Sequence, residues 1–295
     1  MSVSKLAPIF FQGPYLRQNF SLPDSVIYYM AMNPSSAHVY QKLIQTCKYF
    51  FAKNPIIVLQ CLHFIDDEWI ICVGECKITK SNGRKFDIEK ISRKFWITHV
   101  LNTGVDGQIA PPSIISKLYR CDIKHCLLHQ QSITFDQLLF LASSADVLIL
   151  EKCVVTDNSG SHVQIENIVA AFPTILKFAS NQDALNTSIN TVKNLFKIPH
   201  FSTLSRFFMF QISDLFDIET VYEYLKTCEN GIHFCFIFSD SISDAYLARL
   251  ETIVDDILET SSSYNYKFPY IFIPSLNIDK QEALFERYYE NLSLP

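Results

Sequence analysis

Several features that would point to catalysis or to a membrane are scarce in this sequence of 295 residues. Glycine occurs only 7 times, and there is no Walker motif, no G-x-S-x-G and no G-x-G-x-x-G, so phosphate-cradling loops are not expected. No apolar run approaches the roughly 18–20 residues of a membrane span. The start of the chain lacks the apolar segment of a secretory signal. We therefore expect no enzyme and no membrane association, and we expect a cytoplasmic or nuclear location.

Basic residues are fewer than acidic residues, 25 against 30. The formal net charge is −5 and the isoelectric point is near 5.9, so the chain lacks the electrostatic footprint of a nucleic-acid-binding protein. Hydrophobic residues make up 48% of the chain, which is typical of a folded protein with a substantial core. Nine cysteines are present, mostly in apolar runs. In a reducing compartment they are expected to be reduced and to pack as small hydrophobic residues.

Two helices are predicted near the start of the chain. The first follows Ser21-Leu22-Pro23-Asp24, because proline suits a first helical turn and Ser21 and Asp24 can cap it, and it ends at Asn33-Pro34. The second begins after Ser36 and ends at Asn54-Pro55. Each has an apolar stripe at helical spacing. Periodicity alone favours a helical hairpin that packs on the body of the protein.

The residues of this pair resemble the F-box. Leu22-Pro23 is followed by an apolar helix and then by the pattern Leu-x-x-x-Cys-Lys-x-Phe, which begins at Leu43 and ends at Phe50. This copy departs from the usual F-box pattern at two positions, because Ser25 replaces a glutamate and Phe50 replaces a tryptophan. The resemblance implies docking on a Skp-type adaptor protein. The residues expected to contact the adaptor are Leu22, Pro23, Val26, Ile27, Met30, Leu43 and Cys47.

A strand followed by a helical block recurs through the second half of the chain. Strand starts can be placed at Tyr119, Val147, Ile175, Phe207, Ile232 and Tyr270. The pattern Leu148-x-Leu150-x-x-Cys153 is matched by Leu176-x-Phe178-x-x-Asn181 and Phe208-x-Phe210-x-x-Ser213, among others. It resembles the leucine-rich-repeat core, in which a polar residue or cysteine follows two alternate apolar residues. We therefore predict an α/β protein in which the helical module precedes an atypical leucine-rich-repeat-like β/α solenoid. Predicted helix starts include the capping box Thr134–Gln137 and Ser243.

The alternate strand positions would face a binding partner, because solenoids bind on the face made by parallel strands. This predicts an outward surface that runs from charged to apolar and aromatic, covered either by a protein target or by the C-terminal segment. The residues predicted to contact the target are Lys124, Glu151, Lys177, Phe207, Met209 and Gln211.

Three regions result: a helical module over 1–54, irregular early repeats or a small connecting sheet over 55–116, and the repeat region with a final helix over 117–295. With phrases such as RKFWIT, KLYRCDI and KIPHF, the layout resembles a group of nematode F-box-like proteins with divergent leucine-rich repeats. The resemblance implies the substrate receptor of a Skp–cullin–F-box type ubiquitin ligase, which binds an unidentified protein. The alternative is an adaptor-independent scaffold whose first helices only cap the solenoid.

No metal or other cofactor is predicted. CDIKHCLLH (121–129) holds two cysteines and two histidines, but same-face residues four apart on a strand lie about 13 Å from each other, too far for one zinc ion. Cys61, His63, Cys72 and Cys76 form a second group, and its spacing matches no common zinc site.

Overall fold

The computed structural model describes residues 19–72, 76, 83–104, 109–181, 186–227, 231–260 and 267–292. Within these ranges the protein is a mixed α/β protein with a mostly parallel sheet. The chain divides into two compact units, Met1–Pro55 and Ile56–Pro295, and each has its own apolar core. No described helix is long and apolar enough to span a bilayer.

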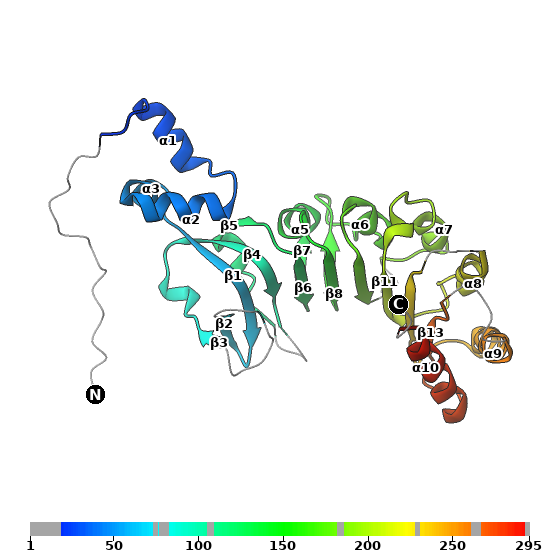
Figure 1. Ribbon diagram of the computed structural model, residues 1–295. Coiled ribbons are helices and arrows are strands. Elements are labelled where there is room, and N and C mark those ends of the chain that lie inside the picture. Colours follow the sequence, from blue (N-terminus) through cyan, green and yellow to red (C-terminus); the bar gives the residue numbers. More distant parts are fainter. Residues whose placement is uncertain are drawn as a thin grey trace, which may run out of the picture. The chain divides into compact units, whose positions relative to one another are not determined.

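The first unit contains three helices, α1 (Asp24–Met32), α2 (Ala37–Thr46) and α3 (Lys48–Lys53) (Figure 1). The predicted cap at Ser36 is confirmed, since the Val39 N–H donates to its Oγ over 3.2 Å. Pro23 occupies the N-cap of α1 and no side chain makes a capping hydrogen bond there, so the predicted capping by Ser21 and Asp24 is wrong, but Asp24 lies in the first turn, where its charge suits the positive end of the helix dipole. The single helix predicted up to Asn54 is also wrong. Cys47 adopts extended backbone, and its Sγ accepts a hydrogen bond from the Tyr49 N–H that starts α3.

The second unit is built on an eleven-stranded sheet whose order is β13-β12-β11-β10-β8-β6-β4-β1-β2-β3, with β5 pairing beside β4. From β4 onward every pair is parallel, and successive main strands lie side by side in chain order (Figure 1). The strands of the sheet are β1 (Ile56–Ile65), β2 (Glu68–Cys72), β3 (Gly83–Lys85), β4 (Lys94–Asn102), β5 (Leu118–Cys121), β6 (His125–His129), β8 (Val147–Glu151), β10 (Lys177–Asn181), β11 (Arg206–Ile212), β12 (His233–Phe238) and β13 (Tyr270–Phe272). Strands β7 (Ser132–Thr134) and β9 (Val154–Thr156) form a separate parallel pair.

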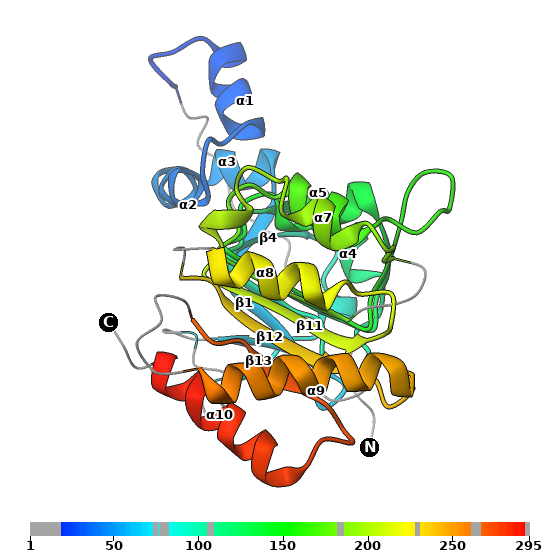
Figure 2. The same cartoon turned by 90° about the vertical axis from the view of Figure 1, so that its right-hand side faces the viewer.

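Helices pack on one face of this sheet and share a single apolar core with it. They are α4 (Ile114–Lys117), α5 (Phe135–Ala142), α6 (Ile165–Ala171), α7 (Thr191–Leu195), α8 (Ile218–Thr227) and α9 (Asp244–Glu259), with short 3-10 turns at Ile88–Lys90 and Phe201–Thr203. Helix α10 (Ile278–Leu292) packs at the β13 end of the sheet. The predicted capping box at Thr134 and the cap at Ser243 are confirmed. Helices α9 and α10 lie at the end of the sheet that β12 and β13 form (Figure 2).

Residues 56–116 continue the main sheet. Strand β1 pairs in parallel with β4, and β4 pairs with β6, so this region belongs to the same sheet as the strands that follow. Strands β2 and β3 extend it by antiparallel pairing.

Three residues at or near the ends of strands share one backbone conformation. Gln130, Lys152 and Gln211 have φ values of 49°, 51° and 57°, in the left-handed region. The first two follow β6 and β8 directly, and Gln211 lies at the register shift near the end of β11. Residues other than glycine seldom adopt this conformation, so its return at similar places indicates structurally related turns.

The strand pairing corrects the predicted register. Phe178 lies opposite Phe207, and Phe207 lies opposite Phe234, so these three side chains share the helix-facing side. Phe207 and Met209 are buried, with 1% and 0% of their surface exposed, and their prediction as partner-contacting residues is wrong. Phe208 and Phe210 face outward instead, because neighbouring residues of a strand point to opposite faces.

Leu176 is also misplaced by the predicted pattern. Its side chain is 47% exposed, and its carbonyl accepts from the Ser205 and Arg206 N–H groups in the turn before β11. Leu176 therefore precedes strand β10, whose first inward residue is Phe178.

Truncating Phe207 tests this register. We expect Phe207→Ala to lower the free energy of unfolding by about 3–5 kcal/mol, because a buried ring leaves a cavity. Phe208→Ala, one residue along on the outward face, should cost clearly less. Denaturant unfolding followed by tryptophan fluorescence measures both, since Trp69 and Trp96 lie in the second unit. Equal losses from the two variants would contradict the register.

Candidate functional site

The first unit exposes much of the apolar surface that the F-box resemblance assigned to the adaptor. Leu22 is 49% exposed and Val26 is 41% exposed, and Pro23 is exposed beside them. Met30, Leu43 and Cys47 are partly buried against the core of the unit. These six residues are therefore at least partly accessible within their unit.

Ile27 is the exception among the predicted adaptor contacts. It is 5% exposed and packs with Ala31 and Phe50 in the core of the first unit, so its prediction as a contact residue is wrong. Ile27 follows Val26 by one residue, which rotates its side chain by about 100° around the helix. That rotation turns it from the exposed face toward α3.

Two tyrosines extend the exposed surface of α1 beyond the predicted residues. Tyr28 is 50% exposed and Tyr29 is 66% exposed. Tyr29 lies three residues after Val26, and positions three apart share a helix face. The signal was present in the sequence, because DSVIYYMAM is apolar on all sides, and such a helix can bury only part of its surface against one neighbour.

The second candidate surface is the face of the sheet opposite the helices, which we call the open face. One row of side chains on this face, one from each strand of the sheet from β6 to β13, consists of residues that are paired directly with one another. These side chains are half-buried or small, and they lie outside the apolar core cluster of the unit. The row consists of Leu127, Ile149, Ala179, Phe208, Cys235 and Tyr270.

The four charged or polar residues predicted to contact a target lie around this face. Lys177 and Gln211 are exposed. Lys124 lies in the turn before β6 and pairs with Asp146 over 3.2 Å. Glu151 pairs with the Nδ1 of His129 over 2.9 Å. Together with Phe208 and Phe210, the open face thus combines apolar strand positions with charges at its margin.

Helix α10 covers the β13 end of the open face and the sheet edge. The Tyr288 ring lies 6.1 Å from that of His233 and 5.7 Å from that of Tyr270, measured between centroids. At the edge, Gln281 binds the β13 backbone: its Nε2 donates to the Ile271 carbonyl and its Oε1 accepts from the Ile273 N–H. The C-terminal segment therefore covers the last strands, in part as predicted.

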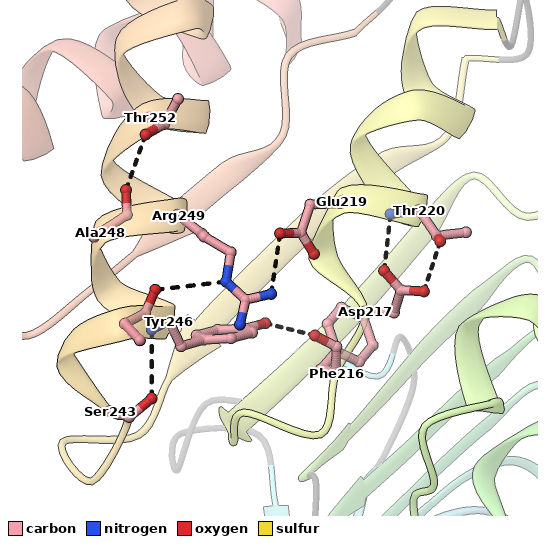
Figure 3. Close-up of polar contacts among 10 residues, drawn as sticks. Phe216, Asp217, Glu219, Thr220, Ser243, Tyr246, Ala248, Arg249 and Thr252 are labelled. Atoms are coloured by element: carbon pink, nitrogen blue, oxygen red, sulfur yellow. Dashed lines mark hydrogen bonds and ion pairs between the residues drawn. The ribbon is translucent and has the colours of Figure 1, made fainter.

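A cleft of about 510 Å³ between α8 and α9 carries five acidic side chains. Much of this charge is balanced by cations. Arg249 contacts Glu219 over 3.2 Å (Figure 3), and Lys226 contacts Asp256 over 3.2 Å. Tyr246 donates to the Phe216 carbonyl across the same pair of helices (Figure 3). These contacts join α8 to α9, and we assign the cleft a structural role.

A third feature is a cluster of Cys61, His63, Cys72 and Cys76, whose potential ligand atoms all lie within 4.8 Å of one another. The Sγ atoms of Cys72 and Cys76 are 3.6 Å apart, and the His63 Nε2 is 3.3 Å from the Cys76 Sγ. Cys61 and His63 are buried, and Cys72 and Cys76 are half-buried. The spacing of these residues in the sequence gave no sign of this convergence.

Burial controls the protonation of the cluster. Burial first, and then the neighbouring Cys76 and Cys72, raise the pKa of the Cys61 thiol. The pKa of the Cys72 thiol is also raised, again first by burial. Burial lowers the pKa of His63. Near neutral pH and without a bound cation, these three groups are therefore uncharged.

The residues of CDIKHCLLH do not gather into one group. Cys121 and Cys126 are buried in the core on the helix side. His125 lies beside His99, with ring centroids 5.3 Å apart, and His129 pairs with Glu151. Alternation along β6 therefore sends Cys126 to one face and the two histidines to the other.

Comparison with known proteins assigns no family to this chain: no family model matches it, and no curated protein matches it either. The two surfaces and the cluster therefore rest on the geometry of this chain.

His233, under α10, gives a pH-dependent prediction. The Lys267 Nζ lies 2.8 Å from its Nε2. Burial first, and then the positive charges of Lys267 and Arg206, lower the pKa of His233 to about 4. Between pH 6.5 and about 4 the unfolded chain binds a proton at this residue that the folded chain does not, so stability falls as pH falls through this window.

The test compares unfolding of the wild-type chain and of His233→Phe from pH 7 to pH 4. We expect the variant to lose less stability over this range, because it keeps a ring beside Tyr288 and removes the titration. Equal pH slopes for the two proteins would refute the assignment. A histidine NMR titration gives the pKa directly, and Lys267→Gln should raise it.

Proposed function

We propose that this chain is a protein-interaction scaffold that acts as the substrate receptor of a Skp–cullin–F-box type ubiquitin ligase. Its first unit docks on a Skp-type adaptor, and the open face of its second unit holds a protein target. The observation that carries this proposal is the exposed apolar surface of α1 at Leu22, Val26 and Tyr29. The chain supplies proximity, while the transfer chemistry takes place elsewhere in the complex.

Docking by the first unit is supported by the difference between its core and its surface. The unit buries Ile27, Ala31 and Phe50 among its own helices and leaves Leu22 and Val26 exposed. Exposed apolar and tyrosine side chains on one short helix are typical of binding surfaces.

A leucine-rich-repeat-like solenoid is supported by the order and turns of the strands. Parallel neighbours follow one another in chain order from β6 to β13, and left-handed residues recur in the turns. Two of the polar positions that the repeat pattern marked also bond neighbouring backbone. The Asn181 Oδ1 accepts from the Lys152 N–H over 2.9 Å, and the Cys153 thiol lies 3.3 Å from the Leu128 carbonyl to which it donates.

Target binding on the open face is supported by its composition. Parallel sheets are usually covered on both faces. In the described part of this chain, α4 to α9 pack on one face, and α10 reaches the other face at its β13 end. Phe208, Phe210, Ile237 and Phe272 are partly exposed on the open face. Such aromatic and aliphatic positions, flanked by Lys177 and Arg206, suit a protein partner that supplies apolar anchors and acidic side chains.

The adaptor interaction is tested by measuring the dissociation constant between the full-length chain and a purified Skp-type adaptor. We expect saturable binding, and we expect the double variant Leu22→Ala/Pro23→Ala to bind at least about tenfold more weakly, which corresponds to about 1.4 kcal/mol. The two residues are exposed, so the variant should keep its fold.

Ile189→Ala is the matched control, because Ile189 is an exposed aliphatic residue of the second unit. It should bind the adaptor as tightly as the wild-type chain does. No binding by a folded wild-type chain would refute docking and favour the adaptor-independent scaffold. Equal weakening in both variants would show that the contact does not depend on the surface of α1.

A further inference from the structure

The cluster of Cys61, His63, Cys72 and Cys76 has the dimensions of a metal site. A four-ligand zinc ion holds sulfur at about 2.3 Å and nitrogen at about 2.0–2.1 Å, which separates tetrahedral ligand atoms by about 3.5–3.8 Å. The measured separations are 3.6 Å for Cys72 and Cys76 and 3.3 Å for His63 and Cys76, and all four ligand atoms lie within 4.8 Å of one another. Small side-chain movements would therefore suffice to enclose one ion.

We propose that these four residues form a closed Cys3His site for a structural zinc ion, independent of the adaptor and target surfaces. Three thiolates and one imidazole are the donor set that Zn²⁺ favours over Mg²⁺ or Ca²⁺, which take oxygen ligands. All four tetrahedral positions are filled by protein, which is typical of structural sites, whereas catalytic sites keep one position open.

The strands explain how the four residues meet. Cys61 and His63 are two residues apart on β1, so their side chains share one face. The antiparallel register pairs His63 with Ile70 and Ile65 with Glu68, and continuing it by two residues places Cys72 opposite Cys61. Asp66 and Asp67, both at positive φ, make the tight turn that fixes this register. Cys76 follows four residues after the end of β2.

The histidine geometry identifies the ligand nitrogen. The His63 Nε2 is the ring atom that faces Cys76. Its Nδ1 is buried and makes no hydrogen bond to any residue that the structure describes. The ring is fixed on β1, so Nε2 is the nitrogen that can bind an ion, and the proton of the neutral ring would remain on Nδ1.

The bound ion would hold Cys76 against both strands of the β1–β2 hairpin. Strands β2 and β3 form the end of the sheet opposite β13, and β3 has only three residues. Metal binding would add to the stability of the folded chain at this end of the sheet. A disulfide between Cys72 and Cys76 would prevent these two sulfur atoms from binding zinc.

The test is elemental analysis of the full-length chain purified without chelator under reducing conditions, together with the absorption spectrum after exchange with Co²⁺. We expect about one zinc ion per chain and, with cobalt, the intense visible bands of a tetrahedral thiolate site. The double variant Cys72→Ser/Cys76→Ser and the variant His63→Ala should each hold almost none.

Two variants separate loss of the site from loss of the fold. His63→Cys should retain about one ion, because four thiolates also bind zinc. Cys153→Ser should retain it too, since Cys153 lies outside the cluster and a hydroxyl can replace its hydrogen bond to Leu128. The proposal is overturned if the folded wild-type chain holds no more zinc than Cys72→Ser/Cys76→Ser. It is equally overturned if mass spectrometry finds a Cys72–Cys76 disulfide in folded, metal-free protein.

Discussion

Parallel pairing in a common register fixes the two faces of the second unit. Once Phe178, Phe207 and Phe234 lie side by side against the helices, their neighbours Ala179, Phe208 and Cys235 must lie side by side on the open face. A slip of one residue in any strand would bury one row and expose the other. The core, the open face and the placement of Cys61 with His63 all depend on this alternation.

The two ends of the sheet are closed by different means. At β13, Gln281 supplies an amide that binds the strand backbone as another strand would, and Arg287 donates to the Ile257 carbonyl near the end of α9. At the other end, β3 is short and carries Arg84 and Lys85, which discourage pairing with a second chain. The β13 edge is therefore covered by side chains of a helix, whereas the β3 edge depends on shortness and charge.

Local features of this chain could be predicted from the sequence, because they depend on residues close together. Ser36, Thr134 and Ser243 cap their helices as predicted. The register of β11 could not be predicted, since the run RFFMFQI offers apolar residues to both faces. The strand pairing, which is not encoded locally, decides between them.

The four metal-ligand candidates were recognised as a group in the sequence, but their spacing did not predict that they converge. Their convergence depends on the pairing of β1 with β2 and on the path to Cys76, and neither follows a known ligand spacing. The exposed surface of α1 could be predicted from the sequence only in part. Its apolar composition on all sides was evident, but assigning Ile27 to the core and Val26 to the surface required the position of α3.

The two faces of the sheet are covered unequally, which bears on the proposed target. A parallel sheet carries apolar side chains on both faces, and its stability depends on removing both from water. Helices remove one face, and α10 covers the other only near β12 and β13. Ile149 and Phe208 remain partly exposed in the middle of the open face, where polar residues would be expected in a protein that functions alone. The proposed protein target would cover these side chains.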